Sequence, residues 1–353
     1  MSLPKSLPLP NIFTRESAPS LRWGVIGSGH IASAFVTATM RFTNQCFVAV
    51  GSRSLERAEA FASQLGLPCA VGSYEDLVTR KDIDVVYVAA PQSEHLRLGL
   101  LAITAGKHVL IEKPLAMTEA EGRALTDAAR DAGVFLMEAM WTRYLPQSDV
   151  IRRLVRDGVL GDLELVIADH GQAISRDGTS RLWKRELGGG AIGDIGIYPI
   201  ALSSEMLGEP EEIVARGGVT STGVDSHATM ILNHPNGAQA SLTASMLTST
   251  PIRATIAGED ARIDIGQPFF TPASFTLSGP LVYGGERIEW KDPTGLSMYD
   301  GLSWEATALA KFVGEGRRES PLHNHTETLS ILATIDEARR QVLSHSGANE
   351  TAR

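Results

Sequence analysis

Cysteine is scarce in this sequence, because only Cys46 and Cys69 occur among 353 residues. Two cysteines exclude a disulfide framework and a cysteine-rich zinc cluster, and they favour a reducing compartment, for which we expect the cytoplasm. Long apolar runs are also lacking, since none reaches the roughly 18–20 residues that span a bilayer. Prolines interrupt the first 20 residues, which therefore do not resemble a signal peptide. We interpret residues 1–20 as a flexible arm, or as an arm that wraps a neighbouring subunit.

Basic residues are also fewer than acidic residues. Lysine and arginine total 32 against 41 aspartates and glutamates, which leaves a formal net charge of −9. This balance argues against nucleic acid or an anionic membrane as a partner. Apolar residues make up 43% and charged residues 21%, as in ordinary globular proteins. A chain of this length exceeds what one core usually supports, so we expect two domains.

Strand and helix patterns alternate from residue 22 to about residue 140. Short apolar runs, typical of strands buried on both faces, are followed by segments of helical periodicity. The runs read RWGVIG, CFVAVGS, DVVYVAA, KHVLIEK and VFLMEA. Such alternation predicts right-handed βαβ units and hence an α/β domain with a doubly wound parallel sheet.

After Trp141 the pattern changes. One helical segment, SDVIRRLVRDGVLG, precedes several strand-like segments joined by short turns, among them HPNGAQ with its Asn-Gly hairpin signal. Strands linked without helices indicate a mostly antiparallel sheet, and helical patterns return at the end of the chain. We therefore expect an arm over residues 1–20, a dinucleotide-binding Rossmann domain over 21–142, an α+β domain for substrate and oligomerisation over 143–325, and a C-terminal helix over 326–353 that packs back near the first domain.

The first strand leads into GVIGSGHIA, whose small residues have the spacing of a dinucleotide fingerprint. Gly27 permits a tight turn, Gly29 lets the backbone approach a pyrophosphate, and Ala32 allows close helix–strand packing. The following helix N-terminus offers free N–H groups to the phosphates. Small residues at a turn also serve packing alone, but here the motif lies at the first of five βα units. We predict cofactor contacts from Gly27, Ser28, Gly29, His30 and Ile31.

The end of the second strand bears on which dinucleotide binds. NAD sites commonly place an acidic residue there for the ribose hydroxyls, whereas this chain has Ser52 and Arg53. A hydroxyl and a guanidinium suit a 2′-phosphate, which a carboxylate would repel. We therefore predict NADP, with Ser52, Arg53 and Arg57 as contacts. NAD stays the alternative, in which Arg53 is a solvated turn residue.

Three further segments, AAPQSEH, EKPLAMT and EAMWTRY, follow parallel strands at the sheet edge where such folds bind ligands. In EKPLAMT, Lys113 stands at a strand end, where a lysine is costly to bury without purpose. Its alternative interpretation is a surface ion pair with Glu112. The predicted cofactor contacts of these segments are Ala90, Pro91, Gln92, His95, Glu112, Lys113, Trp141 and Arg143, and we predict that the last two also contact substrate.

Several candidates have plainer interpretations. His95 is equally well explained as a hydrogen-bonded histidine in the first turn of a helix, and Trp141 as a core residue. His170 is a predicted substrate contact, although strand alternation does not fix the face on which it lies. The HNH sequence at residues 323–325 lacks a further ligand at a recognised spacing, so we expect no metal.

Together with RLWKRELGGGAIGDIGIYP, these motifs resemble the glucose–fructose oxidoreductase / inositol dehydrogenase / MocA (Gfo/Idh/MocA) family from about residue 20 to the final helix. Within that family, MEAMWTRYLP and ELGGGAIGDIGIYP are most similar to dimeric dihydrodiol dehydrogenases and NADP-dependent D-xylose dehydrogenases. The resemblance implies a Rossmann domain, an open-faced sheet domain that dimerises, and hydride transfer between NADP and a hydroxyl-bearing carbon. It also implies that Lys113 and Tyr198 carry out the chemistry.

These two roles agree with the residue types. Oxidation of a carbinol carbon requires its hydroxyl proton to leave, and a tyrosine phenol can relay that proton as general base. A neighbouring lysine cation favours the phenolate of a side chain that otherwise titrates at about pH 10. We expect Asp194 to orient the substrate or Lys113, or else to cap a helix. Asp194 and Tyr198 share a face if their segment is helical, but Pro199 leaves that boundary open.

The leading hypothesis is an NADP-dependent oxidoreductase that acts on a small polyhydroxylated ring, either an aldose or a trans-dihydrodiol. Tyr198 favours that branch, because many relatives with inositol-type substrates have a histidine there. We expect a homodimer or homotetramer formed through the open β-sheet face, because such a face normally needs a partner. Two alternatives stay open: an NAD(P)-using glycoside hydrolase of the same fold, and a dinucleotide-binding sensor without catalysis.

Overall fold

The computed structural model describes residues 3–350, with the exception of residues 177 and 282. The chain forms two compact units. The antiparallel-sheet unit contains Met1–Asn11, Pro146–Leu296 and Ser330–Arg353, and the parallel-sheet unit contains Ile12–Leu145 and Ser297–Leu329. The limits expected from the sequence place most of Ser297–Leu329 in the α+β domain. Its packing within the parallel-sheet unit is a long-range contact, for which the sequence carries no local signal.

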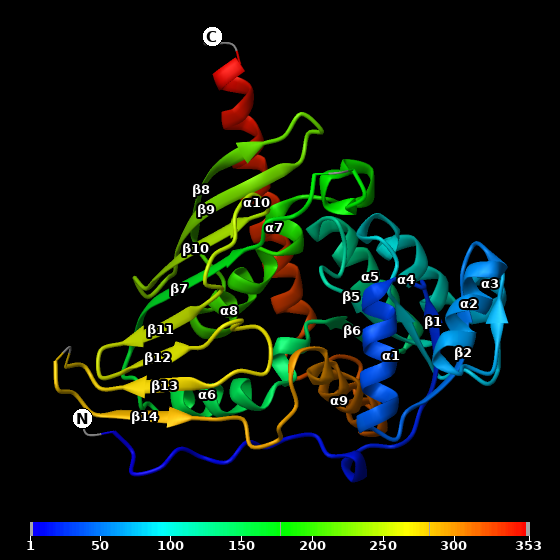
Figure 1. The fold of residues 1–353 in the computed structure, drawn as a ribbon, viewed down its shortest axis with the longest axis horizontal. Helices are drawn as coiled ribbons and strands as arrows, with labels where there is room; N and C mark the ends of the chain where they lie inside the picture. Colours follow the sequence, from blue (N-terminus) through cyan, green and yellow to red (C-terminus); the bar gives the residue numbers. More distant parts are fainter. Residues whose placement is uncertain (1–2, 177, 282, 351–353) are drawn as a thin grey trace. The chain divides into compact units, whose positions relative to one another are not determined.

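In the described chain, the parallel-sheet unit contains six strands in the order β3-β2-β1-β4-β5-β6, of which Figure 1 labels β1, β2, β5 and β6. All of the described pairs are parallel, which confirms the predicted doubly wound sheet. Strand β4 is buried along its whole length, as expected of an apolar run in such a sheet. The strands are β1 (Arg22–Ile26), β2 (Cys46–Gly51), β3 (Ala70–Val71), β4 (Val85–Val88), β5 (His108–Glu112) and β6 (Leu136–Ala139).

The helices of this unit begin and end at residues with ordinary capping chemistry. In α5, the Thr118 hydroxyl accepts a hydrogen bond from the Glu121 N–H at 3.2 Å, and Gly133 ends the helix at φ 66°. The helices are α1 (His30–Phe42), α2 (Leu55–Leu65), α3 (Tyr74–Val78), α4 (His95–Thr104), α5 (Glu119–Ala132) and α9 (Leu302–Gly314). Helix α9 packs against α1, so a segment from late in the chain covers the first βα unit.

The antiparallel-sheet unit contains a described sheet in the order β14-β13-β12-β11-β7-β10-β9-β8. Its described pairs are antiparallel except for β7 with β10, which confirms the mostly antiparallel prediction. Strands β13 and β14 were not predicted from the sequence; they pair with each other, and a Phe275–Trp290 ring stack joins them. The strands are β7 (Leu163–Gly171), β8 (Glu212–Val219), β9 (Asp225–Asn233), β10 (Gln239–Ser245), β11 (Ala254–Gly258), β12 (Arg262–Ile265), β13 (Phe275–Ser278) and β14 (Arg287–Trp290).

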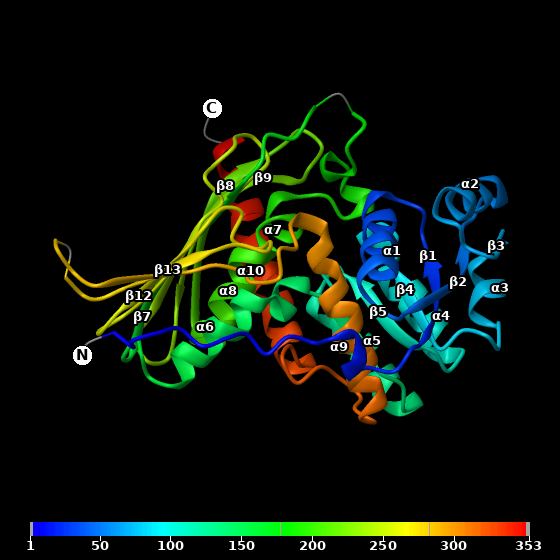
Figure 2. The ribbon, with the colours of Figure 1, turned by 60° about the horizontal axis from the view of Figure 1, so that its bottom comes forward.

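Helices cover one face of this second sheet (Figure 2). They are α6 (Pro146–Arg156), α8 (Ile197–Leu207) and the part of α10 (His325–Glu350) that belongs to this unit. Buried and exposed residues alternate along β9, so that Met230 and Leu232 face the core while Ile231 points away from it. None of the helices in the described ranges is both long and apolar enough to cross a membrane.

The N-terminal segment of the antiparallel-sheet unit makes polar contacts with it. The Leu3 N–H donates to a carboxylate oxygen of Glu286, and the Asn11 N–H donates to Asp149 of α6 at 2.8 Å. The Arg153 guanidinium, also on α6, donates to the Leu9 carbonyl at 2.6 Å. Residues 3–11 are therefore held along α6 and the β14 side of this unit.

Candidate active site

The turn between β1 and α1 has the geometry of a phosphate-binding turn. Gly27 has φ 103°, and a Cβ atom there would lie 2.5 Å from the Ala89 carbonyl oxygen, so the turn packs directly on the end of β4. Among the described residues, a Cβ atom on Gly29 would meet nothing within 4 Å. Gly29 is the N-cap of α1, and no side chain caps the helix. In the described chain the first N–H groups of α1 thus have no side-chain cap, and a helix N-terminus of this kind suits an anion.

The residues after β2 carry two exposed cations. Ser52 is buried, and its hydroxyl accepts from the Ser54 N–H at 3.3 Å. Ser54 in turn caps α2 by accepting from the Arg57 N–H. The side chains of Arg53 and Arg57 lie at the surface. The structure thus places Ser52 and Arg53 in the turn after β2 and Arg57 in the first turn of α2.

Side chains after β4 hold the backbone that follows β5. The two ring nitrogens of His95 contact the Pro114 carbonyl at 2.9 Å and the Ala90 carbonyl at 3.0 Å, and the ring is buried. Gln92 donates to the Ala116 carbonyl at 3.1 Å. Within the described residues, Gln92 Oε1 is buried and has no hydrogen-bond partner. The interpretation of His95 as a hydrogen-bonded histidine is thereby supported, while Gln92 keeps an acceptor available for a ligand.

Lys113 follows the end of β5 and is half-buried, with a cis peptide bond to Pro114. Its neighbour Glu112 is buried and accepts a hydrogen bond from the Tyr87 hydroxyl at 2.5 Å. Beside Glu112 lies Glu305 of α9, whose carboxyl oxygens have no hydrogen-bond partner in the described chain. Burial, with the nearby charge of Glu112, raises the pKa of Glu305 well above its usual value.

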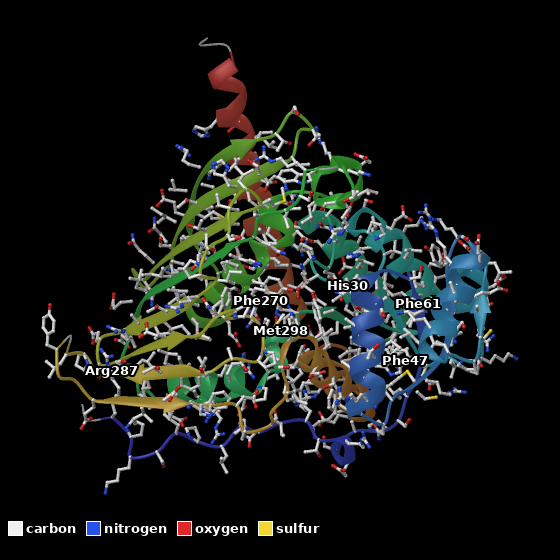
Figure 3. The ribbon with its side chains drawn as sticks, in the orientation of Figure 1. His30, Phe47, Phe61, Phe270, Arg287 and Met298 are labelled. Atoms are coloured by element: carbon white, nitrogen blue, oxygen red, sulfur yellow. The ribbon has the colours of Figure 1, made fainter. Side chains whose placement is uncertain are left out.

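Trp141 and Arg143 lie in the short helix η3 (Trp141–Tyr144) and are both buried. Trp141 stacks on Tyr299, with ring centroids 6.3 Å apart, and the Tyr299 ring meets His30 edge-on at 5.4 Å. Tyr299 belongs to η6 (Met298–Gly301), beside the phosphate turn. In Figure 3, the labels of Met298 and His30 mark the positions of η6 and of the start of α1. Sequence analysis missed Tyr299 because its loop has no periodicity. Arg143 forms an ion pair with Glu327 at 2.6 Å, so its predicted ligand contacts stay a prediction.

In the antiparallel-sheet unit, Asp194 and Tyr198 belong to two short helices and not to one. Asp194 ends α7 (Ala191–Asp194), whereas Tyr198 is the second residue of α8. Pro199 is tolerated because it lies in the first turn of α8, where a backbone N–H has no intrahelical partner. The Asp194 carboxylate pairs with Arg181 at 2.7 Å. The predicted shared helix face is therefore interrupted between the two residues.

Two rings, those of Phe270 and His170, lie against the ring of Tyr198. The Tyr198 ring stacks on Phe270 with centroids 4.3 Å apart and an interplanar angle of 15°. His170 stacks on the same Phe270 at 4.6 Å, is buried, and contacts the Ile195 carbonyl through Nδ1 at 3.1 Å. The structure thus resolves the face of His170, which lies with Tyr198. Phe270 was not predicted from the sequence, because it follows Gln267 and Pro268 in a loop without helical or strand periodicity.

A Rossmann-type parallel sheet with an uncapped phosphate turn, together with an open antiparallel sheet, defines a two-domain NAD(P)-binding oxidoreductase. The comparisons agree. The model of the oxidoreductase family with an NAD-binding Rossmann fold (GFO/IDH/MocA) matches residues 21–140, and that of the GFO/IDH/MocA C-terminal domain matches residues 149–264. The chain belongs to the GFO/IDH/MocA oxidoreductase family and is an NAD(P)-dependent oxidoreductase.

Several relatives are similar to this chain over most of its length. A trans-1,2-dihydrobenzene-1,2-diol dehydrogenase from Danio rerio is 37% identical over 92% of this chain and 97% of its own, and one from Xenopus laevis is 35% identical over 91% and 98%. Among solved structures, a 3-ketoreductase from Actinomadura kijaniata with NADP and TDP-benzene has a TM-score of 0.81 at 27% identity, covering 92% of this chain and 98% of its own. Aldose-aldose oxidoreductase from Caulobacter crescentus with glycerol has a TM-score of 0.81 at 25% identity, covering 93% and 98%.

Proposed function

We propose that this oxidoreductase uses NADP and transfers a hydride to or from a hydroxyl-bearing carbon of a small ring, with a trans-dihydrodiol as the first choice of substrate and an aldose as the second. The observation that carries the proposal is the half-buried Tyr198 phenol stacked on Phe270 and near His170. Flat aromatic faces favour a planar, partly unsaturated ring. The names of the dihydrodiol dehydrogenase relatives support the same order of substrates.

In this proposal the chain's own residues move the proton. Tyr198 takes the proton of the substrate hydroxyl during oxidation and returns it during reduction. Lys113 is the cation that stabilises the phenolate, and Asp194 orients the substrate. The dinucleotide, when bound, accepts or supplies the hydride. The open space at Gly29 and the orphaned acceptor of Gln92 fit such a ligand, and Tyr299 with Trp141 would cover it.

Substitution at the two chemical positions tests the mechanism. Tyr198→Phe and Lys113→Ala should each lower kcat at least about 100-fold, while NADP still binds in a fluorescence titration. Tyr283→Phe is the matched control, because Tyr283 is 92% exposed, and it should keep full activity. The substrate panel contains dihydrodiols, aldoses, inositols and glycosides. Redox turnover is followed at the absorbance of the reduced cofactor, and glycoside cleavage is followed by the release of free sugar.

Each outcome of that panel decides something. Full activity of either Tyr198→Phe or Lys113→Ala contradicts the assigned roles. Retained cofactor with glycoside cleavage and no net absorbance change favours the hydrolase alternative. Dinucleotide binding without turnover of any panel member favours the sensor.

NADP is proposed over NAD because Ser52 and Arg53 lie in the turn after β2 and Arg57 lies in the first turn of the following helix α2. A 2′-phosphate would accept charge-assisted hydrogen bonds there. Arg53→Asp should raise the KM for NADP about 10- to 100-fold while leaving the KM for NAD within about twofold, which makes NAD the internal control. An unchanged preference for NADP in the variant removes Arg53 from the site.

The uncovered face of the antiparallel sheet supports a homodimer. Val214, Ile231 and Ile167 are 37%, 43% and 47% exposed. Strand register places them with Ser241 in one row across β8, β9, β10 and β7. Such a row of apolar side chains suits an isologous contact with a second copy. Light scattering tests this, and a monomeric mass at working concentration contradicts it.

We propose the cytoplasm as the location, because both cysteines are free in the structure.

A further inference from the structure

The segment 318–325, here called the strap, runs along β6 in the parallel-sheet unit. Strand β6 is an edge strand of its sheet. The Leu136 N–H donates to the Arg318 carbonyl at 3.1 Å, and His325 Nε2 contacts the Leu136 carbonyl at 3.0 Å. The strap thus covers backbone groups that an edge strand would otherwise expose. It also contains the HNH sequence, for which the proposed function has no use.

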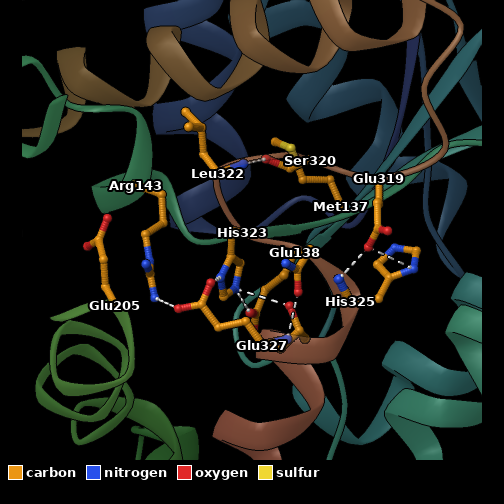
Figure 4. A network of polar contacts seen from close by, with 12 residues as sticks. Met137, Glu138, Arg143, Glu205, Glu319, Ser320, Leu322, His323, His325 and Glu327 are labelled. Atoms are coloured by element: carbon orange, nitrogen blue, oxygen red, sulfur yellow. Dashed lines mark hydrogen bonds and ion pairs between the residues drawn. The ribbon is translucent and has the colours of Figure 1, made fainter. Parts of the chain in front are cut away.

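His323 of the strap lies between two carboxylates (Figure 4). Its Nε2 is 2.6 Å from an oxygen of Glu138 on β6, and its Nδ1 is 3.4 Å from an oxygen of Glu327 on α10. The side chains of His323 and Glu138 are fully buried, and that of Glu327 is 21% exposed. The Thr328 hydroxyl also contacts the imidazole, at 3.1 Å.

The charges of this cluster balance. Burial lowers the pKa of His323, but hydrogen bonds to Glu138 and Glu327 outweigh burial and raise it, even with Arg143 nearby. Burial alone would raise the pKa of Glu327, but the His323 hydrogen bond and the Arg143 charge lower it to about 2. An imidazolium and a guanidinium therefore face two carboxylates, which is the form in which buried charges are tolerated.

The second oxygen of Glu138 reaches the turn that carries Lys113. Glu138 Oε1 accepts from the Leu115 N–H at 2.7 Å, two residues beyond Lys113. The carbonyls on either side of this N–H, those of Pro114 and Ala116, are the ones contacted by His95 and Gln92. Side chains thus contact one backbone group of each of the three residues after Lys113. Glu138 is the one charged acceptor among the three contacts named here, and a charged acceptor makes the stronger bond.

The other end of the cluster reaches η3. Glu327 uses its Oε1 for Arg143 Nη2 at 2.6 Å and its Oε2 for His323. Arg143 lies two residues after Trp141, which stacks on Tyr299 beside the phosphate turn. His323 is thus the link between the Lys113 turn and the Trp141 helix.

We propose that His323 and Glu138 are positioning residues that fix the Lys113 turn through the Leu115 N–H, with His323 orienting the Glu138 carboxylate. The proposal rests on the proposed function, because it is the assigned role of Lys113 that gives the turn its importance. It also explains the HNH sequence without a metal: the partners of His323 are an oxygen of Glu138, one of Glu327 and a hydroxyl. Within the residues that the structure covers, no group of three or more histidine, cysteine, aspartate or glutamate side chains could hold a metal ion.

Two variants and a control test the proposal on the full-length protein. His323→Gln removes the cation, and Glu138→Asp keeps the charge but shortens the side chain, so that it cannot reach Leu115 and His323 together. His325→Gln is the control, because His325 belongs to the same strap but contacts the Leu136 carbonyl. Deuterium exchange of the peptide that contains Leu115, measured by mass spectrometry, reports on the turn directly. Assays of kcat and NADP affinity accompany it.

His323→Gln and Glu138→Asp should each speed exchange at Leu115 about tenfold and lower kcat about tenfold or more, with NADP affinity within about twofold of the wild-type value. His325→Gln should leave all three unchanged. Wild-type exchange at Leu115 in either folded variant overturns the proposal, as does an equal effect of His325→Gln, which would show a general role of the strap. A wild-type protein without dehydrogenase activity contradicts the proposed function instead, and the exchange measurement still decides the positioning.

If His323→Gln does not fold, Glu138→Asp decides alone. It retains a carboxylate in the buried cluster, so the imidazolium keeps a partner of opposite charge. Faster exchange at Leu115 with a lower kcat supports the proposal, and wild-type values of both overturn it.

Discussion

Two glycine-rich segments, one in each unit, look alike in the sequence and serve different purposes. Gly27 and Gly29 form the turn after β1, and Gly188–Gly190 lead into α7. In the second segment, a Cβ atom on Gly189 would lie 2.4 Å from the Leu182 carbonyl oxygen, and one on Gly190 would lie 2.4 Å from Asp225 Oδ1. In the first, a Cβ atom on Gly29 would meet nothing within 4 Å.

The difference separates glycines that the fold requires from Gly29, for which we propose a ligand contact. Gly27, Gly189 and Gly190 leave room for the chain's own backbone and side chains. Gly29 leaves room for something outside the chain, at the uncapped N-terminus of a helix. Alanine at Gly27, Gly189 or Gly190 should therefore lower the stability of the fold, whereas alanine at Gly29 should change only cofactor binding.

Gly190→Ala should give the largest loss of stability. Gly190 has φ 131°, where L residues are strained, and its added methyl group would displace Asp225, whose carboxylate accepts from the Ile192 N–H at 2.6 Å in the first turn of α7. We expect about 3 kcal/mol or more of lost unfolding free energy in urea denaturation. Gly208→Ala is the control, since Gly208 has φ 83° but no neighbour within 4 Å of its Cβ position. Equal losses in the two variants would remove the Asp225 contact from the explanation.

Charged side chains show the same contrast: some stabilise the fold, and others are proposed to bind the ligand. Arg53 is exposed beside the phosphate turn, whereas Arg143 is buried against Glu327. Because the pKa of Glu327 is lowered to about 2, its ionised form stabilises the fold above about pH 4.5, and this contribution is lost as the pH falls toward 2. Glu327→Gln should therefore cost about 3 kcal/mol at pH 7 and progressively less between pH 5 and 2, measured by denaturation at several pH values.

Glu337→Gln is the matched control for that experiment. The pKa of Glu337 is also lowered to about 2, by hydrogen bonds from Arg340 and Gln341, but its side chain is 36% exposed and its partner Arg340 is 66% exposed. Solvent screens such a pair, so its removal should cost well under about 1 kcal/mol. A pH-independent loss in Glu327→Gln, or an equal loss in the control, would contradict the role of burial.

Sequence patterns predicted most of the fold because local signals were strong. The apolar runs of the parallel sheet, the GxGxxA turn and the Asn-Gly hairpin each depend on neighbouring residues. Strands β13 and β14 were missed; what joins them to the sheet is pairing with β12 and with each other and the Phe275–Trp290 ring stack, which are contacts across the sheet and not a pattern along the chain. The return of Ser297–Leu329 to the parallel-sheet unit depends on contacts between segments far apart in the chain, such as α9 with α1.

The same limit applies to the candidate site. Lys113, Tyr198 and the phosphate turn stand in motifs that can be read along the chain. Tyr299 and Phe270 stand in irregular loops and gain their meaning from the rings that they contact. The sequence predicted no metal at the HNH residues and gave no other role for His323. Its partners Glu138 and Glu327 lie on two other elements, β6 and α10.

Gly29→Ala should have the smallest effect on stability and the most selective effect on function. Gly29 has φ −86° and ψ 179°, which alanine adopts without strain, and its Cβ position is open. The unfolding free energy of the ligand-free protein should therefore stay within about 0.5 kcal/mol of the wild-type value. The new methyl group would occupy the space of the pyrophosphate, so the Kd for NADP should rise about tenfold, or 1.4 kcal/mol.

Gly27→Ala provides the contrast within the same turn. Its methyl group would meet the Ala89 carbonyl oxygen at 2.5 Å from a residue at φ 103°, so this variant should lose stability even without ligand. Denaturation of the ligand-free proteins and NADP titration by fluorescence measure the two effects separately. If Gly29→Ala binds NADP as the wild type does, the open space at Gly29 does not hold the pyrophosphate. If it instead unfolds as readily as Gly27→Ala, then both glycines of the turn serve the fold, and the contrast with Gly188–Gly190 disappears.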